Sequence, residues 1–270
     1  MTARSCPPRV LTIAGSDSGG GAGIQADLKT FQDWGCFGMS AITALTAQNS
    51  TGVTGVYKVS GEFVAAQMEA VLDDIGVDAL KCGMLAEAGV IDAVAGVLER
   101  YPSPPLVLDT VLVAKSGDPL LEDDAVEVMV EKLFPRAAVI TPNAVEAGRL
   151  TGIEVTGEDT MRAAAGKLQE LGAAGVLVKG GHLAGDDLLD LLVLADGESK
   201  LFKGKRIHTK HTHGTGCTLS AAIAAGLARG MGLTDAVAKA REYLQRGITN
   251  AHPTGAGYGT LLHEPFEPDA

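Results

Sequence analysis

The chain has 270 residues, a formal net charge of −11, 46% apolar residues and 20% charged residues. This length and apolar content predict a folded protein of one large domain or two small ones, and they exclude a disordered chain. The acidic balance supplies no clustered positive charge, so we expect neither nucleic acid nor a membrane surface as a partner.

The chain contains four cysteines, Cys6, Cys36, Cys82 and Cys217. No two of them have a Cys-x-x-Cys spacing, which is typical of reduced thiols in a cytosolic protein. The apolar run at 10–14 is too short for a signal peptide, and the long uncharged stretches at 34–57 and 211–228 are rich in polar residues and glycine. We therefore expect a cytoplasmic protein.

Short apolar runs alternate with helical periodicities along the chain. In chain order they predict a strand at 10–14, helices around 24–31 and 64–75, a strand at 78–82, a helix around 90–97, a strand at 106–110, a helix around 126–133, a strand at 137–141, a helix around 161–171, a strand at 176–179, two strands within 188–207, and helices at 215–229 and 233–249. This alternation predicts a three-layer α/β/α fold with a mostly parallel sheet. We expect one domain over 10–262, an N-terminal extension at 1–9 and a C-terminal tail at 263–270.

Ligands of such sheets bind beyond the carboxyl ends of the strands, where a glycine-rich loop at 15–23 follows the first predicted strand. Residues 21–26 match the dinucleotide fingerprint G-x-G-x-x-A, but no acidic residue stands between Asp33 and Glu62 to bind a ribose hydroxyl. Two interpretations remain: a turn that passes close to the sheet, or a ligand loop with Asp17 and Asp27 as acceptors. No Walker motif occurs in the chain, which excludes a P-loop enzyme.

A second glycine motif, residues 213–220, leads directly into a predicted helix. Gly214, Thr215 and Gly216 would present backbone N–H groups at the helix N-terminus, which is an anion site that needs no lysine. Cys217 would lie in the first helical turn, where the pKa of a thiol falls and a thiolate could serve as a base. The alternative is a small buried residue in an ordinary helix.

A metal site is the alternative to the anion site, because three histidines cluster with Cys217 in this region: His208, His211 and His213. Their spacing matches no common zinc pattern.

Polar residues also end three of the other predicted strands. Asn143 is predicted to cap a helix, with Glu146 one turn further on, either facing the sheet mouth or serving only a capping box. Lys179 and Asp109 each end a buried run. A lysine at that position is more than a solvated charge only if a phosphate lies nearby.

Eight motifs in order resemble the hydroxymethylpyrimidine/phosphomethylpyrimidine kinases of thiamine synthesis, within the ribokinase-like superfamily. The motifs are residues 13–27, 47–49, 83–85, 108–111, 114–121, 140–143, 178–182 and 212–220. Each motif alone is weak evidence for this family, but eight motifs in the same order over residues 10–262 are specific evidence. The resemblance implies transfer of the ATP γ-phosphoryl group to the hydroxymethyl group of 4-amino-5-hydroxymethyl-2-methylpyrimidine, and then a second transfer to the monophosphate. It also implies Mg²⁺ as cofactor and a homodimer.

The resemblance further implies roles for single residues. Cys217 matches the position of the aspartate base in the sugar kinases, and Gly214, Thr215 and Gly216 match the anion hole. The substrate pocket would comprise Gln48, Gly15, Asp27, Met84 and Val111. The nucleotide would contact Lys179, Asn143 and Thr212, and Mg²⁺ would be organised by Glu146 and Asp109.

One residue departs from the family pattern and two alternative functions remain. His211 stands where relatives commonly carry Asn, which leaves the nucleotide contacts open. Pyridoxal kinase is the nearest rival, although Gln48 favours a pyrimidine because its amide both donates and accepts. A non-catalytic ligand sensor is disfavoured because the glycine motif, Cys217 and Glu146 occur together.

Overall fold

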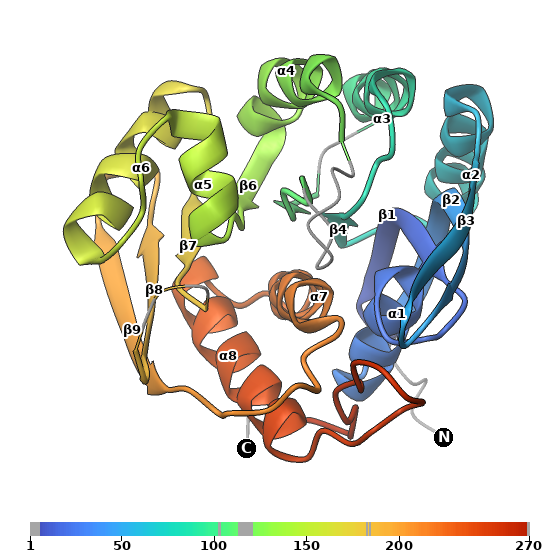
Figure 1. Ribbon diagram of the computed structural model, residues 1–270. Coiled ribbons are helices and arrows are strands. Elements are labelled where there is room, and N and C mark those ends of the chain that lie inside the picture. The colour runs from blue at the N-terminus through green and yellow to red at the C-terminus, as the bar shows by residue number, and fades with distance from the viewer. Residues whose placement is uncertain (1–5, 102–103, 113–120, 182, 184, 269–270) are drawn as a thin grey trace, which may run out of the picture.

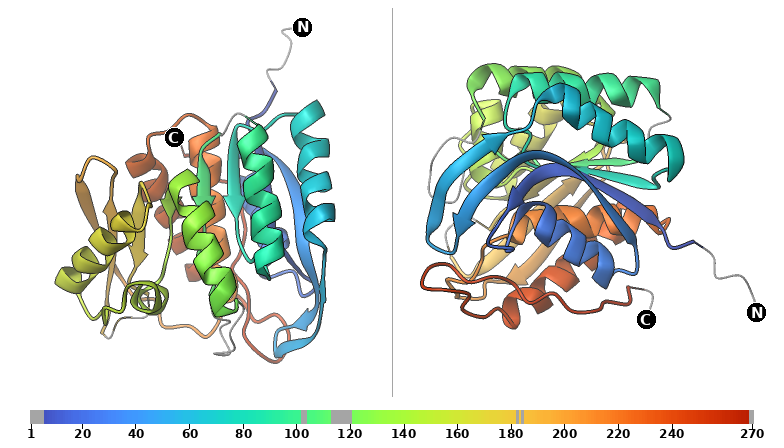
Figure 2. Two further views of the ribbon diagram at one scale, coloured as in Figure 1. Left: turned by 90° about the horizontal axis from the view of Figure 1, so that it is seen from above. Right: turned by 90° about the vertical axis from the view of Figure 1, so that its right-hand side faces the viewer.

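The computed structural model describes residues 6–101, 104–112, 121–181, 183 and 185–268. Its centre is a nine-stranded sheet in the order β3-β2-β1-β4-β5-β6-β7-β8-β9, with helices on both faces (Figure 1 and Figure 2). The strands are β1 (Arg9–Asp17), β2 (Phe37–Asn49), β3 (Gly52–Lys58), β4 (Ala79–Cys82), β5 (Leu106–Leu108), β6 (Ala137–Ile140), β7 (Val176–Lys179), β8 (Asp187–Val193) and β9 (Ser199–Lys205). Six neighbouring strands pair in parallel, in the order β2, β1, β4, β5, β6 and β7. At the edges, β3 pairs antiparallel with β2, β8 with β7, and β9 with β8. The predicted mostly parallel α/β/α fold is therefore confirmed.

The helices divide between the two faces of the sheet. They are α1 (Gly23–Asp33), α2 (Gly61–Asp74), α3 (Ala88–Arg100), α4 (Asp123–Lys132), α5 (Ala144–Thr151), α6 (Glu158–Glu170), α7 (Thr215–Ala228) and α8 (Leu233–Thr249), with a 3₁₀ turn at Phe134–Arg136. One core packs α2, α3, α4 and α6 against the sheet, and the other packs α1, α7 and α8. Successive strand residues alternate between these cores, as Val10 and Leu11 do, because strand side chains point to opposite faces. Within the described residues, no helix combines the length and the apolar character needed to cross a membrane.

The hairpin of β2 and β3 is the part of the sheet that the sequence did not predict. The sequence marks the stretch at 34–57 only as uncharged and predicts no strand there, yet β2 alone has 13 residues. Every residue of β3 is exposed, so the apolar alternation that marks a half-buried strand is absent there. The Asn49 side chain forms the turn by accepting hydrogen bonds from the backbone N–H and the hydroxyl of Thr51.

The last described residues pack against the domain rather than extending from it. Phe266 is 5% exposed and its ring lies 5.1 Å from that of Trp34 and 5.4 Å from that of Tyr243, between centroids. His263 is adjacent to this cluster, with its Nε2 atom 3.3 Å from the Thr218 hydroxyl of α7. The segment expected as a tail at 263–270 therefore contributes to the core beside α7 up to residue 268.

Burial of His263 predicts an acid-sensitive stability. Burial, assisted by Lys29, lowers the pKa of His263 to about 4, below the ordinary 6.5, so the neutral ring stabilises the fold above pH 6.5 and that contribution is lost as the pH falls towards 4. In urea titrations, we expect the free energy of unfolding to fall by about 2 kcal/mol more between pH 7.5 and 5 in the wild type than in His263→Gln. The exposed His208→Gln should keep the wild-type dependence; equal curves for wild type and His263→Gln would contradict the assignment.

Candidate active site

The N-terminus of α7 forms a tight turn against the loop that follows β1. Gly214 caps α7 with a φ of 83°, in the left-handed region that favours glycine. A Cβ atom at Gly214 would lie 1.8 Å from the carbonyl oxygen of Gly21. The two glycine-rich segments thus touch through their backbones. The N–H of Thr215 donates to the Thr212 carbonyl oxygen at 3.5 Å, and the N–H groups of the next residues lie at the helix N-terminus, where an anion is favoured.

A cavity of about 900 Å³ opens in front of this turn. Ten of the fourteen predicted site residues line it: Asp109, Val111, Asn143, Glu146, Lys179, Thr212, Gly214, Thr215, Gly216 and Cys217. They come from the carboxyl ends of β5, β6 and β7 and from the start of α7. The parallel strands therefore bring segments more than 100 residues apart in sequence to one opening.

Lys179 and Asp109 form an ion pair in the cavity wall. The Nζ atom of Lys179 lies 2.9 Å from Oδ1 of Asp109, and Asp109 also accepts hydrogen bonds from Thr141 and Ser220. Burial alone would raise the pKa of Asp109, but Lys179, Lys81 and the Thr141 hydrogen bond outweigh it and hold the pKa below its usual value. Both groups are therefore charged and fixed in the cavity wall.

Asn143 and Glu146 form a complete capping box at the start of α5. Asn143 Oδ1 accepts from the N–H groups of Val145 and Glu146, and Glu146 Oε2 accepts from the N–H of Asn143 at 2.8 Å. Burial raises the pKa of Glu146 to about 7, with Lys179 opposing the shift and Asp109 adding to it. The capping interpretation is thus confirmed, while both side chains also face the cavity.

The low thiol pKa expected for Cys217 is wrong. Burial raises the pKa of Cys217 to about 11, although Lys81 acts in the opposite direction. The helix N-terminus favours the thiolate, but the lost hydration of a negative sulfur outweighs it. Cys217 is accordingly a neutral thiol at pH 7.

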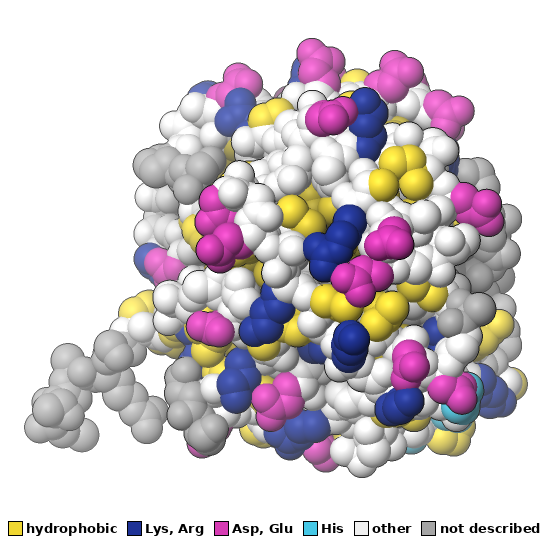
Figure 3. Space-filling view, turned by 90° about the vertical axis from the view of Figure 1, so that its left-hand side faces the viewer, with side chains coloured by type: hydrophobic (Ala, Val, Ile, Leu, Met, Phe, Trp, Pro, Cys, Tyr) yellow, Lys and Arg dark blue, Asp and Glu magenta, His cyan; other side chains and the backbone are white. Residues whose placement is uncertain are grey.

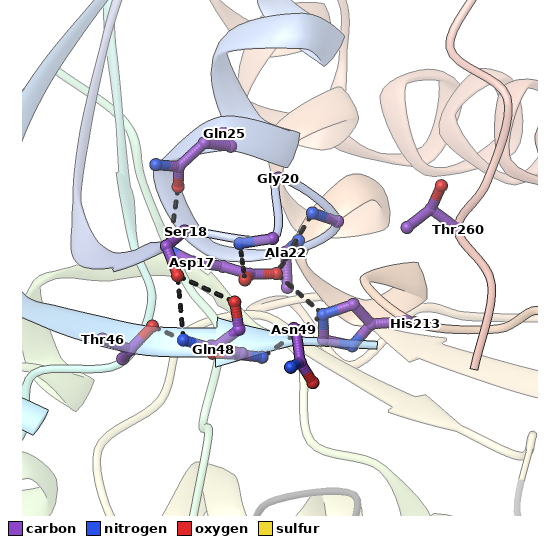
Figure 4. Close-up of polar contacts among 12 residues, drawn as sticks. Asp17, Ser18, Gly20, Ala22, Gln25, Thr46, Gln48, Asn49, His213 and Thr260 are labelled. Atoms are coloured by element: carbon purple, nitrogen blue, oxygen red, sulfur yellow. Dashed lines mark hydrogen bonds and ion pairs between the residues drawn. The ribbon is translucent and has the colours of Figure 1, made fainter. Parts of the chain in front are cut away.

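Asp17 and His213 join the loop after β1 to the turn before α7 (Figure 4). Oδ2 of Asp17 lies 2.8 Å from Nε2 of His213, and the Asp17 carboxylate also accepts from the backbone N–H groups of Gly19, Gly21 and Ala22. Burial would raise the pKa of Asp17, but His213 and the loop amides lower it. Asp17 thereby organises the glycine loop as an ionised carboxylate.

Gln48 lies beside the same histidine (Figure 4). Its Nε2 atom is 3.4 Å from Nε2 of His213, and its Oε1 atom accepts from the Thr46 hydroxyl at 3.1 Å. Gly15 and Met84 are neighbours at the ends of β1 and β4, since a Cβ atom at Gly15 would lie 2.5 Å from Met84 Cε. These three predicted substrate residues do not line the cavity, but His213 does and connects it to Gln48.

Asp27 does not fit the predicted substrate-binding role. Its side chain is fully buried and paired with Lys81 at 2.8 Å, and it accepts a hydrogen bond from the Thr12 hydroxyl at 2.6 Å. Both carboxylate oxygens are occupied on the α1 side of the sheet. Its position after the glycine loop predicts a ligand contact, but its side chain lies in the interior against Lys81 and Thr12 and does not line the cavity.

Arg206 is a site residue that the sequence did not reveal. Its guanidinium donates to the carbonyl oxygens of Gly181, Leu183 and Gly185, and thereby holds the segment after β7 at the cavity. No motif marked this arginine, because its partners are backbone atoms. Residues 114–120 of one predicted motif and His182 of another lie outside the described residues.

Phosphoryl transfer depends on positioning and charge neutralisation more than on covalent chemistry. The cavity supplies both, through the N-terminus of α7 and the charged groups facing it. The fold and the site therefore define a class, that of the ribokinase-like kinases.

Comparison with known proteins gives the family. A family model described as phosphomethylpyrimidine kinase matches residues 17–262. A hydroxymethylpyrimidine/phosphomethylpyrimidine kinase of Streptomyces coelicolor is 49% identical, covering 95% of this chain and 94% of its own. The chain is 51% identical to a thiamine biosynthesis bifunctional protein of Geobacter sulfurreducens, aligned over 94% of this chain but only about half (52%) of that protein. The chain belongs to the phosphomethylpyrimidine kinase family, as its motifs predicted.

A solved structure supports the same placement. The ADP complex of Bacillus subtilis pyridoxal kinase is similar with a TM-score of 0.88 and 36% identity, covering 97% of this chain and 98% of that one. The chain is therefore an enzyme of this kinase class, and ATP is its co-substrate. The non-catalytic alternative receives no support from these relatives.

Proposed function

We propose that the protein transfers the γ-phosphoryl group of ATP to the hydroxymethyl group of 4-amino-5-hydroxymethyl-2-methylpyrimidine, and then a second phosphoryl group to the resulting monophosphate. The main support is one juxtaposition. Gln48 lies beside His213, and His213 directly precedes the anion turn at Gly214. A ring held at Gln48 would thus present its hydroxymethyl group to a phosphate held at α7.

The nucleotide would occupy the cavity, with its phosphates at the N–H groups of the α7 turn and at Lys179. Asp109 and Glu146 would hold Mg²⁺, which commonly binds through one or two carboxylates together with substrate phosphates. The residues fit such an ion, because Glu146 is a buried carboxyl group whose raised pKa reflects incomplete compensation of its charge. The bound metal would neutralise phosphate charge during transfer.

Cys217 would take the proton of the substrate alcohol. The hydroxymethyl oxygen forms a bond to the γ-phosphorus, the bond from that phosphorus to ADP breaks, and the alcohol proton passes to the Cys217 thiolate to give the thiol. Because this transition state is loose, the proton leaves late and a small thiolate population suffices. Gln48 orients the ring through an amide that donates and accepts at the aminopyrimidine edge.

Release of ADP tests the function directly. With MgATP and the hydroxymethylpyrimidine, the purified protein should release ADP and form first the monophosphate and then the diphosphate, separated by ion-exchange chromatography. Pyridoxal is the second candidate acceptor, because a pyridoxal kinase shares the fold at 36% identity. ADP release with pyridoxal but not with the pyrimidine would overturn the proposal in favour of that candidate.

Removal of the Gln48 amide should weaken pyrimidine binding. For Gln48→Ala, we expect the KM for the pyrimidine to rise about tenfold or more while the KM for ATP is nearly unchanged, because about one to two hydrogen bonds to the ring are lost. Steady-state kinetics with each substrate varied in turn measure this. The exposed α1 residue Gln32 supplies the control Gln32→Ala, and an unchanged pyrimidine KM in Gln48→Ala would remove Gln48 from the pocket.

A second copy of the chain would cover the edge strand β3. Val56 and Tyr57 are 57% and 71% exposed, and an edge strand presents unpaired backbone groups. The opposite edge, β9, is protected by Lys200, Lys203 and Lys205, and the face that includes it carries Lys and Arg among Asp and Glu side chains (Figure 3). This contrast points to β3 as the pairing edge of a homodimer.

Light scattering during size-exclusion chromatography tests the homodimer. The wild type should elute at about twice the mass of one chain, and Val56→Lys should elute as a monomer because a buried ammonium group opposes pairing. Lys203→Glu on β9 should remain dimeric. A monomeric wild type would contradict the proposal.

A further inference from the structure

A glycine-rich segment near the C-terminus, residues 255–260, has no part in the mechanism above. It passes the turn between β2 and β3, where the backbone N–H groups of Gly257 and Tyr258 donate to the hydroxyl and the carbonyl oxygen of Ser50, at 3.1 and 2.9 Å. Ser50 follows Gln48 by two residues. One end of the segment is therefore fixed close to the residue proposed to contact the substrate ring.

The other end of the segment pairs with the chain just before the anion turn. His213 and Thr260, which are near each other in Figure 4, form a parallel β-bridge, and the N–H of His213 donates to the carbonyl oxygen of Gly259 at 3.3 Å. A Cβ atom at Gly21 would lie 2.5 Å from both Cδ2 of His213 and Cγ2 of Thr260. Residues 255–260 thus join the β2–β3 turn to the glycine loop after β1 and to the chain before α7.

His211 holds this segment through its side chain. Its Nδ1 atom accepts a hydrogen bond from the N–H of Gly259 at 3.0 Å, as an imidazole nitrogen does only when it carries no proton. Gly259 is buried, and a Cβ atom there would lie 2.3 Å from Nδ1 of His211 and 2.3 Å from the carbonyl oxygen of His252. The absence of a side chain at Gly259 thus permits the contact. His211 does not line the cavity, so it is not placed to contact a nucleotide bound there.

We propose that His211 is a positioning residue, which holds the 255–260 segment in place and thereby fixes the acceptor ring at Gln48 relative to the phosphate at the anion turn. For the identity of the acceptor, this inference rests on the proposed function. The contact between His211 and the segment does not depend on that identity.

Two sets of contacts hold the chain around Gln48. The Ser18 hydroxyl accepts from the N–H of Gln48 and donates to its carbonyl oxygen, both at 2.8 Å, which ties Gln48 to the glycine loop after β1. The 255–260 segment ties the following turn, through Ser50, to the chain before α7. Because misplacement of reacting groups by about 1 Å can cost about 10²-fold in rate, loss of the second set should affect transfer more than folding.

Removal of the imidazole tests the assignment by steady-state kinetics. In His211→Ala, we expect kcat with the pyrimidine to fall about tenfold and the pyrimidine KM to rise about fivefold, while the KM for ATP stays within about twofold. His211→Asn should restore both values, because its side-chain oxygen can accept from the same N–H. A purely structural contact would lower the folded fraction, and hence the apparent kcat, without changing the pyrimidine KM. The control is Gln169→Ala, which removes a side chain that holds two other loops through the carbonyl oxygens of Ala174 and Leu194 and should keep wild-type kinetics.

Hydrogen exchange gives a readout that needs no substrate. The peptides covering 255–262 and 47–52 should exchange about fivefold faster in His211→Ala than in the wild type and in His211→Asn, because one hydrogen bond that closes the segment is lost. Gly259→Ala removes the same contact from the other partner and should show the same change. Wild-type exchange in a folded His211→Ala protein, or a wild-type kcat and pyrimidine KM in it, would overturn the proposal.

The outcomes separate this inference from the proposed function. If the wild type phosphorylates pyridoxal and not the pyrimidine, the proposed function fails, and the same kinetic changes in His211→Ala are then expected with pyridoxal. If the wild type phosphorylates the pyrimidine and His211→Ala does so with wild-type kinetics, the role of His211 fails while the proposed function stands.

Discussion

Replacement of Cys217 by alanine is expected to lower kcat by about 10²–10⁴-fold, with less than about a threefold change in the KM of either substrate, because the loss of a positioned base costs that much. Cys217 lines the cavity and follows the anion turn directly. It does not contact the pyrimidine edge proposed to bind at Gln48. Initial rates of ADP release at saturating substrates measure the effect.

Cys36 provides a matched control for this substitution. Burial raises the pKa of its thiol to about 11 as well, but Cys36 is a core residue beside Trp34 and Ala225, whereas Cys217 is only half-buried. Cys36→Ala should reduce stability and leave kcat within about twofold of the wild type. If Cys217→Ala also keeps its kcat, Cys217 serves packing only.

The pH dependence of kcat gives a second readout of Cys217. Its pKa of about 11 means that the thiolate fraction rises nearly tenfold for each pH unit between 7.5 and 9.5. If the thiolate accepts the proton, kcat in the wild type should rise with pH over this range, and the rise should be absent in Cys217→Ala. A flat wild-type profile would assign proton acceptance to another group.

The sequence predicted the elements that bury one continuous apolar face. Helices around Val64, Val90 and Met161 and the runs in β1 and β7 lie within or near the predicted ranges, because their periodicity follows from burial. The β2–β3 hairpin does not show this periodicity, because β3 has no buried face. Val53 and Val56 in β3 are 50% and 57% exposed, so backbone pairing with β2, rather than a buried face, defines that strand.

The site residues also fall into those that the sequence could predict and those that it could not. The glycine motif before α7 could be located because backbone geometry restricts Gly214 to glycine, and the conformation leaves a signature in the sequence. The Asp17–His213 pair joins residues 196 positions apart, which no local pattern reveals. The pKa of Cys217 could not be predicted either, since it depends on burial and on charges from β4 and α1 that only the fold brings together.

Substitution of Gly214 by alanine is expected to lower kcat/KM for ATP by about 10²–10³-fold, the cost of losing one oxyanion-hole donor. The φ of 83° is strained for alanine, and the new methyl group would lie 1.8 Å from the carbonyl oxygen of Gly21. Neither the strained φ nor the clash with a backbone oxygen can be relieved by a side-chain movement, so the turn must move away from the loop after β1. Its N–H groups would then no longer converge on one phosphate.

Gly232 separates this effect from helix capping in general. It caps α8 as Gly214 caps α7, but its φ is −63° and a Cβ atom there would meet nothing within 4 Å. Gly232→Ala should keep the wild-type kcat/KM, with a change in stability below about 1 kcal/mol. Nucleotide titration by calorimetry should show weakened ADP binding in Gly214→Ala alone. Wild-type ADP affinity in a folded Gly214→Ala protein would mean that the phosphate binds elsewhere, since a displaced turn cannot hold it.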